Sequence, residues 1–321
     1  MYPGVRISAI LSLVWREARF ESDWWPVPKE PPLNKPLSTL AKLVLLAAGG
    51  LAVVAGPVLF LLPGKTAGYF AWTIKNPMTP VFMGANYFGG IGAIWAMRTN
   101  RWSVARVLFP GIFVFALTQL LATLLHLPIF NWIHPVAWAW LLVYLSSPIA
   151  VAIVFVQMER NYQPGALQPQ PPTRTFRPMM SMLALVSGVV GLALWIWPAA
   201  FPGSPSSGAV PWWAWSLTPL TARVVGGWYL AAAALYATMS LLHPPQALRV
   251  ALFGVACATG LELLGGLLYR SSFDGPTITV GLYLLNAATV LGFAFWNMIR
   301  ITKAARIATT DAKSGPPNSS M

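Results

Sequence analysis

The chain has 321 residues, of which 56% are hydrophobic and 9% are charged. A soluble globular domain carries about 25% charged residues, and a soluble surface as apolar as this one would expose large patches that aggregate. The composition therefore excludes an ordinary soluble fold and predicts a membrane protein, whose apolar surface faces lipid. The net charge of +13 does not indicate nucleic acid as a partner, because membrane proteins gather Lys and Arg in their cytoplasmic loops.

The N-terminal segment, residues 1–40, is expected to be a cytoplasmic arm and connector, without a span. Residues 5–20 (VRISAILSLVWREARF) place apolar side chains along one helical face. This pattern is typical of a helix that lies on the inner leaflet or packs on a partner subunit. Residues 24–36 (WWPVPKEPPLNKP) are rich in proline, which favours an extended connector.

Apolar runs fill most of the remaining chain, each close to the length of about 20 residues with which a helix crosses a bilayer. Lipid offers no hydrogen bonds to the backbone, so such runs must be helical. The breaks between them are polar or rich in Pro and Gly. We therefore predict an all-α, polytopic transmembrane helical bundle of about eight transmembrane helices. The runs are residues 41–63, 80–98, 104–126, 136–158, 179–200, 220–242, 248–270 and 278–300.

The distribution of Lys and Arg predicts the orientation of these helices. If the loops alternate between two sides, one side receives 17 Lys and Arg residues, including both chain ends, and the other receives four. The richer side is cytoplasmic by the positive-inside rule. The chain is thus expected to be a multi-pass protein of the inner (plasma) membrane with both termini in the cytoplasm.

The two halves of the chain resemble each other. AWTIKNPMTPVFMGANY at 71–87 aligns with AWSLTPLTARVVGGWY at 214–229. With four helices in each half, the second half would enter the membrane in the same direction as the first, which predicts two parallel four-helix repeats. The aligned pairs are Trp72 with Trp215, Pro77 with Pro219, Thr79 with Thr221, Gly84 with Gly226 and Tyr87 with Tyr229.

These observations predict the domain organisation. The expected parts are the arm and connector at 1–40, a first repeat at 41–160, a Pro-rich cytoplasmic linker at 161–178, a second repeat at 179–303 and a disordered cytoplasmic tail at 304–321.

The segment W-x-L-T-P-L-T-A-R at 215–223 is similar to one found in uncharacterised bacterial multi-pass membrane proteins. The resemblance covers mainly the second half of the chain. It implies a multi-pass membrane protein, and it brings with it no activity and no functional residue.

Glu262 is the acidic residue that lies well inside a predicted span. Because an ionisable group in the membrane is costly, it marks a candidate functional site. Arg223 is the candidate partner, and three roles stay open: a fixed Arg223–Glu262 pair that pins two helices, a proton or substrate site, or a Glu262 that is protonated or bonded elsewhere. Gln119 and Asn86 are candidates for further polar lining, although such amides also form hydrogen bonds between helices.

Two of the 16 tryptophans, Trp72 and Trp215, occupy matching positions near predicted outer loops. They are candidate interfacial aromatics, either in a belt at the membrane surface or on a surface that binds a lipid, pigment or sugar. Thr79 and Thr221 are expected to cap the helices that follow them.

No motif for an enzyme is present. The chain has no P-loop, no HExxH, no nucleophile elbow and no cluster of Cys and His, so we expect no enzymatic activity, no cofactor and no metal. The leading interpretation is a structural or accessory component of a membrane assembly, with the lipid bilayer, other membrane subunits or further copies of the chain as partners. The alternative is a transporter or a small-molecule- or lipid-binding membrane protein with a site at the repeat interface near Glu262.

Overall fold

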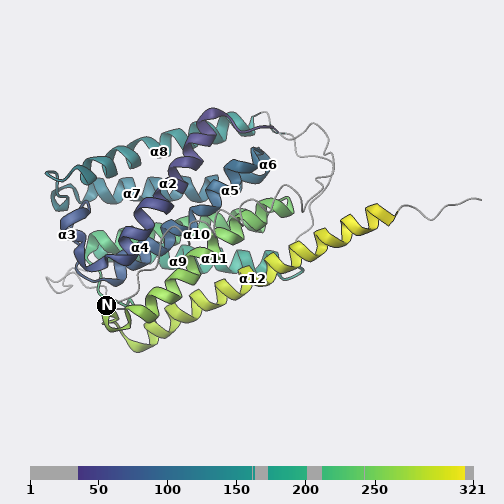
Figure 1. Ribbon diagram of the computed structural model, residues 1–321. Coiled ribbons are helices and arrows are strands. Elements are labelled where there is room, and N and C mark those ends of the chain that lie inside the picture. Colours follow the sequence, from purple (N-terminus) through teal and green to yellow (C-terminus); the bar gives the residue numbers. More distant parts are fainter. Residues whose placement is uncertain (1–34, 161, 163–172, 201–211, 242, 315–321) are drawn as a thin grey trace, which may run out of the picture.

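The computed structural model describes residues 35–160, 162, 173–200, 212–241 and 243–314 (Figure 1). The predicted N-terminal helix and most of the predicted linker lie outside the described residues. Within the described part of the chain every regular element is a helix, with short 3-10 turns between some of them. The helices are α2 (Thr39–Leu61), α3 (Thr66–Tyr69), α4 (Met78–Gly89), α5 (Ile91–Thr99), α6 (Trp102–Ala105), α7 (Phe109–Leu125), α8 (Pro135–Glu159), α9 (Phe176–Ala200), α10 (Pro219–Ser240), α11 (Pro245–Leu268) and α12 (Thr277–Ser314).

The all-α prediction is confirmed, and membrane-type helices are present. Among the described residues, five helical stretches are long and apolar enough to cross a membrane. Fewer helices than the predicted eight meet these criteria of length and apolar composition. The second and third predicted runs are each broken into two shorter helices, and the helix of the sixth run is not among the five. The five stretches are Thr39–Leu61, Pro135–Glu159, Phe176–Ile196, Pro245–Leu268 and Thr277–Ala304.

The breaks in the second and third runs have local causes. The second run divides at Gly90, where a Cβ atom would lie 2.7 Å from the Ala48 carbonyl oxygen on α2, so only glycine permits this close approach. It ends at Asn100, whose φ of 52° is left-handed, a conformation that Asn tolerates at helix ends. The third run becomes helical again at Phe109, the first residue of α7. Pro110 lies in the first turn of this helix, where the backbone N–H that proline lacks would have no partner within the helix.

Close glycine contacts hold the helices together in pairs. A Cβ atom on Gly84 of α4 would lie 2.8 Å from the Gly56 carbonyl oxygen of α2, and one on Gly226 of α10 would lie 2.9 Å from the Gly191 carbonyl oxygen of α9. Small residues let helix backbones approach in this way in membranes. Two further pairings, α4 with α11 and α7 with α10, join the first half of the chain to the second.

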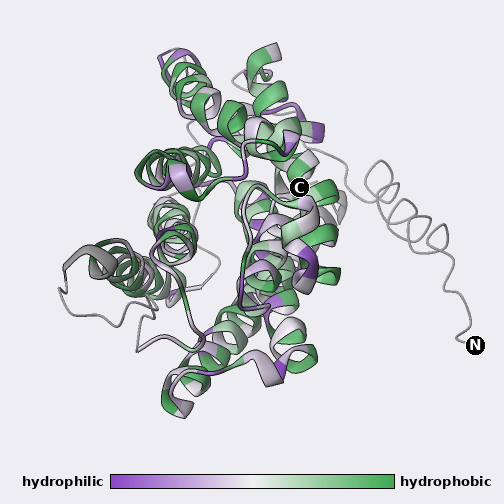
Figure 2. Ribbon diagram, turned by 90° about the vertical axis from the view of Figure 1, so that its left-hand side faces the viewer, coloured by the Kyte–Doolittle hydropathy of each residue, from purple (hydrophilic) through white to green (hydrophobic). Residues whose placement is uncertain are grey.

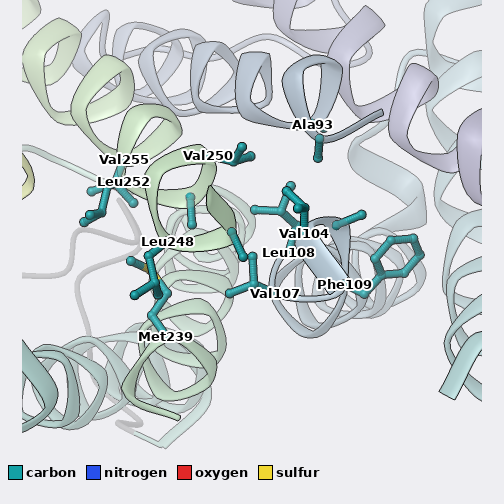
Figure 3. Packing of buried hydrophobic residues seen from close by; sticks show 14 of the residues in the cluster. Ala93, Val104, Val107, Leu108, Phe109, Met239, Leu248, Val250, Leu252 and Val255 are labelled. Carbon is teal, nitrogen blue, oxygen red and sulfur yellow. The ribbon is translucent and has the colours of Figure 1, made fainter. Parts of the chain in front are cut away.

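The apolar core extends to the end of the bundle where α10 passes into α11. Met239 and Leu248 pack there toward Val107 and Leu108 from the turn that precedes α7 (Figure 3). The outward faces of the long helices are also apolar (Figure 2). Leu185 on α9, for example, is 68% exposed, and Ile278 on α12 is 73% exposed, as expected for side chains that face lipid.

The last helix differs from its prediction. α12 continues to Ser314 and projects beyond the other helices (Figure 1), whereas we expected the second repeat to end at 303 and a disordered tail to follow. The sequence KAARIATTDAK at 303–313 contains several good helix formers, which lets the helix propagate past its apolar part.

Candidate polar site in the helical bundle

Glu262 lies on α11, on the face that packs against α4, and is only 6% exposed. The Asn86 side chain on α4 donates a hydrogen bond from Nδ2 to Glu262 Oε1 at 2.7 Å, and the same Nδ2 contacts the Phe82 carbonyl oxygen at 2.9 Å. One to two turns along the same interface, a Cβ atom on Gly254 would lie 2.5 Å from the Gly89 carbonyl oxygen. This close approach of the two helices brings the Asn86 amide to the carboxyl group.

Three tyrosine side chains lie in the neighbourhood of Glu262. Tyr229 and Tyr236 on α10 and Tyr283 on α12 all lie within electrostatic range of it. The Tyr283 hydroxyl is buried and has no hydrogen-bond partner among the described residues. Glu262 itself forms no ion pair with a described Lys, Arg or His. The result is a buried carboxyl group that has one amide donor and, among the residues that the structure describes, no cationic partner.

Of the three roles left open for Glu262, the fixed pair with Arg223 is not formed among the described residues. Arg223 Nη1 instead donates to His126 Nε2 at 2.7 Å. The reason is geometric, because α10 directs Arg223 toward the end of α7, while α11 directs Glu262 toward α4. A guanidinium group only donates, so Nε2 of His126 accepts and carries no proton. Burial, together with the charge of Arg223, lowers the pKa of His126.

Gln119 belongs to a different interface from Glu262. It is fully buried between α7 and α10, where its Nε2 donates to the Val224 carbonyl oxygen at 3.2 Å. Gln119 also lies against Gly227, at the point where a Cβ atom would stand 2.6 Å from its Nε2. Of the four candidate polar residues, the structure therefore brings together Glu262 and Asn86 and places Gln119 and Arg223 elsewhere.

Both candidate interfacial tryptophans are buried in protein. Trp215 is fully buried and donates from Nε1 to the Thr79 hydroxyl at 2.9 Å, across the two halves of the chain. Trp72 is 2% exposed and packs among the rings of Phe70, Phe130 and Trp140. Neither indole lies at an exposed surface, because each packs within a cluster of buried apolar residues.

The capping predictions also need correction. Thr79 is the second residue of α4 and serves as the acceptor for Trp215. The N-cap of α10 is Thr218, and Thr221 is its partner in a capping box. For α10 the predicted cap, Thr221, lies three residues after the observed cap. Pro219 occupies the first helical position, so the cap is the residue before it.

An aspartate that the sequence analysis did not single out joins three loops at the predicted outer end. Asp274 accepts from the Ser216 backbone N–H at 2.6 Å, from the Ser216 hydroxyl at 2.7 Å and from Asn76 Nδ2 at 3.3 Å. Asn76 also donates to the Ser272 carbonyl oxygen at 2.9 Å. The Asp-Gly-Pro turn at 274–276 is the sequence signal for this position. We call Asp274, Ser216 and Asn76 the outer clamp.

We expect Asp274→Asn to lower the free energy of unfolding by about 1 kcal/mol, because an amide loses the charge-assisted bonds of the outer clamp and the clamp is partly open to water. Thermal unfolding in mild detergent, followed by tryptophan fluorescence, measures the change. Ser271→Ala, an exposed position in the same loop, is the control. Equal melting temperatures for the two variants would remove the clamp as a stabilising feature.

At the predicted cytoplasmic end, a second polar cluster was also missed. Glu159 accepts from Arg106 Nε at 2.8 Å, from Arg106 Nη2 at 2.9 Å and from Trp102 Nε1 at 3.0 Å. The neighbouring His243 is 4% exposed. Burial and the charge of Arg106 lower its pKa to about 4, against the opposing effects of the Thr238 carbonyl and Glu159.

Comparison with known proteins finds no matching family, no matching curated protein and no matching solved structure. Within the described part of the chain, no group of three or more His, Cys, Asp and Glu side chains is arranged to hold a metal ion.

Proposed function

We propose that the chain is a multi-pass protein of the inner (plasma) membrane, with about eight spans in two parallel four-helix repeats and with cytoplasmic termini. The helix contacts support a repeat: α4 packs on α2 as α10 packs on α9, and α4 meets α11 as α10 meets α7. The aligned glycines Gly84 and Gly226 occupy corresponding contacts within these pairs. The uneven distribution of Lys and Arg supports the orientation.

We infer further that the protein is a transporter or a small-molecule-binding membrane protein whose site includes Glu262. One observation carries this proposal: a carboxyl group that is 6% exposed within an apolar helix has a single amide donor and no counter-charge among the described residues. An ionised carboxylate at membrane depth costs about 2.5–3.5 kcal/mol on insertion scales. Asn86 supplies a hydrogen bond but no charge, so Glu262 must be neutralised by a proton or by a bound cation. A carboxyl group that exchanges a proton for a bound cation is what a transporter needs in order to couple the movement of its substrate to protons.

Carbodiimide labelling tests whether Glu262 exchanges protons in the folded protein. Dicyclohexylcarbodiimide is an apolar reagent that takes the proton of a neutral carboxyl group on one nitrogen while the carboxyl oxygen adds to its central carbon. The adduct then rearranges to a stable N-acylurea. We expect peptide mass spectrometry to find the label on Glu262, with a yield that falls as the pH rises.

Glu262→Gln is the matched control, because the amide retains an acceptor for Asn86 and has no carboxyl group to label. A circular dichroism spectrum and melting curve like those of the wild type would show that the control is folded. Label that reaches Glu262 only after unfolding in sodium dodecyl sulfate would contradict the proposal and would make the residue a sealed structural group.

A structural or accessory role in a membrane assembly is the second candidate. It is favoured by the outward apolar faces of α9 and α12, of which Leu185 and Ile278 are examples, because helices of a partner subunit fit such faces as well as lipid does. Extraction in a gentle detergent followed by native mass measurement distinguishes the two. A larger assembly would favour the accessory role, and a lone monomer would count against it.

A further inference from the structure

The guanidinium group of Arg223 uses only part of its hydrogen-bonding capacity within the described part of the chain. Nη1 donates to His126 Nε2 at 2.7 Å. Nε is buried without a hydrogen-bond partner, and Nη2 forms no hydrogen bond to a described residue. Nε and Nη2 lie along one edge of the planar group and donate in parallel. One complete edge of Arg223 therefore has no acceptor from the described residues.

Another arginine of the same chain shows what this edge binds. At the predicted cytoplasmic end, Arg106 donates from Nε and Nη2 to the two carboxylate oxygens of Glu159, at 2.8 and 2.9 Å. This is the fork geometry with which a guanidinium group binds a carboxylate or a phosphate group. The Nε and Nη2 edge of Arg223 has the same donors, so an oxyanion is the ligand that it fits.

The chain supplies no acidic group to balance the charge of Arg223 among the side chains that the structure describes. Each of these acids has another partner: Arg106 for Glu159, Asn86 for Glu262 and the outer clamp for Asp274. The sequence of the loop at 201–211, which precedes α10, contains no Asp or Glu. The remaining acids lie at 17–30 and at 311, in the two end segments that are predicted to be cytoplasmic.

The neighbouring groups on α7 do not replace a counter-charge. His126 accepts through Nε2 and is neutral. α7 ends at Leu125, and the negative end of its dipole stabilises a nearby cation only weakly. It also leaves Nε of Arg223 without an acceptor. The positive charge and the free edge of Arg223 are thus available to a group from outside the described chain.

The position of Arg223 matches the depth of lipid headgroups. Arg223 follows the start of α10 at Pro219 by four residues, about 6 Å along the helix, at the predicted outer end of the bundle. Leu124 and Leu125, which precede His126 on α7, are 48% and 60% exposed, as expected for side chains that face acyl chains. A basic side chain at the edge of such an apolar surface lies where lipid phosphate groups are found.

We propose that Arg223 binds a phosphate group through its Nε and Nη2 edge, while His126 holds the guanidinium group from the Nη1 side. The source of the phosphate is the headgroup of an outer-leaflet lipid or free inorganic phosphate, which present the same oxygen atoms to the fork. This site is separate from Glu262, and the inference does not depend on the exchange proposed for that residue.

Native mass spectrometry of the full chain, freed of lipid in a maltoside detergent, tests the inference with defined probes. Dioleoyl phosphatidic acid and dioleoylglycerol carry the same acyl chains, and only the first has a phosphate group. We expect the wild type to retain one tightly bound phosphatidic acid molecule more than Arg223→Gln does, because the glutamine removes both the charge and the fork. The two proteins should retain dioleoylglycerol equally.

Two further variants separate the fork from the general effect of charge. Arg223→Lys keeps the charge but not the fork, so its affinity for the same phosphatidic acid molecule should fall by about tenfold. Arg270→Gln removes an exposed arginine at the same predicted end and should leave the binding unchanged. Melting curves show which variants are folded, and Arg223→Lys carries the comparison if the glutamine variant does not fold.

Inorganic phosphate forms the second arm of the test, with sodium chloride at equal ionic strength as its control. A rise in the melting temperature of the wild type that phosphate causes and chloride does not, and that Arg223→Gln loses, would support free phosphate as the source. Loss of the bound phosphatidic acid molecule in Arg223→Gln alone would support a lipid headgroup. If Arg223 variants changed neither response, or changed them no more than Arg270→Gln does, the inference would be overturned. The carbodiimide labelling of Glu262 is read separately, so the proposed function stands or fails independently of this result.

Discussion

Gly84→Val and Gly226→Val should each lower the free energy of unfolding by about 3 kcal/mol, at the upper end of the range for overpacked sites. A Cβ atom on Gly84 would stand 2.7 Å from the Phe60 backbone nitrogen and 2.8 Å from the Gly56 carbonyl oxygen. On Gly226 it would stand 2.9 Å from the Gly191 carbonyl oxygen. Backbone atoms on the facing helix have no flexible end to move, so the helices themselves must separate.

Unfolding by sodium dodecyl sulfate in mixed micelles, followed by circular dichroism, measures these two changes. Gly50→Val is the matched control, because a Cβ atom on Gly50 of α2 has no heavy atom within 4 Å. We expect the control to remain within about 0.5 kcal/mol of the wild type, as surface substitutions do. If all three variants lost equal stability, the cost would lie in the helix backbone and not in the contacts between α2 and α4 or between α9 and α10.

Acidification should weaken the fold through His243. Its Nε2 lies 2.9 Å from the Thr238 carbonyl oxygen and must donate to it, so Nδ1 is the unprotonated nitrogen, and Nδ1 is buried without a partner among the described residues. Burial and the charge of Arg106 lower the pKa of His243 from 6.5 to about 4. Between these two values the unfolded chain binds a proton that the folded chain does not bind.

The sign of the effect follows from that difference. Stability is complete above pH 6.5 and falls as the pH drops toward about 4, with a total loss of about 3 kcal/mol. His243→Gln keeps an N–H donor for Thr238 and removes the titration, so its stability should depend less on pH. His126, whose pKa is also lowered, adds a slope in the same direction, and His126→Gln measures it separately. Equal pH slopes for His243→Gln and the wild type would contradict the assignment.

Hydropathy predicted the helices well because length and apolar character are properties of one segment at a time. The segments of α2, α8 and α11 agree with the predicted runs to within about three residues. The internal breaks at Gly90 and before Phe109 were missed, because a break depends on what the helix touches. The close approach of Gly90 to Ala48 cannot be read from either segment alone.

The candidate site was predicted in part for the same reason. Glu262 stands out in the sequence as an acid in an apolar run, and Asn86 was among the suggested neighbours. Arg223 was the candidate partner of Glu262 but lies with His126. The depth of a residue along its helix is visible in a sequence, whereas the direction that its side chain faces depends on which helix packs beside it. Trp72 and Trp215 were placed at a surface because tryptophan is common at membrane interfaces, whereas both side chains pack into buried apolar clusters.

The pairing of α4 with α11 and of α7 with α10 has a consequence for biosynthesis. The ribosome completes α4 and α7 while the helices that cover them are still untranslated, so the first half enters the bilayer with Asn86 and Gln119 facing lipid or the insertion machinery. The interhelical hydrogen bonds that these two amides form later contribute only about 0.6 kcal/mol each, so their delay costs the first half little stability. The ionisable carboxyl group of Glu262 is synthesised later, as part of α11. The Asn86 amide, which donates a hydrogen bond to it, is therefore already in the membrane when Glu262 is inserted.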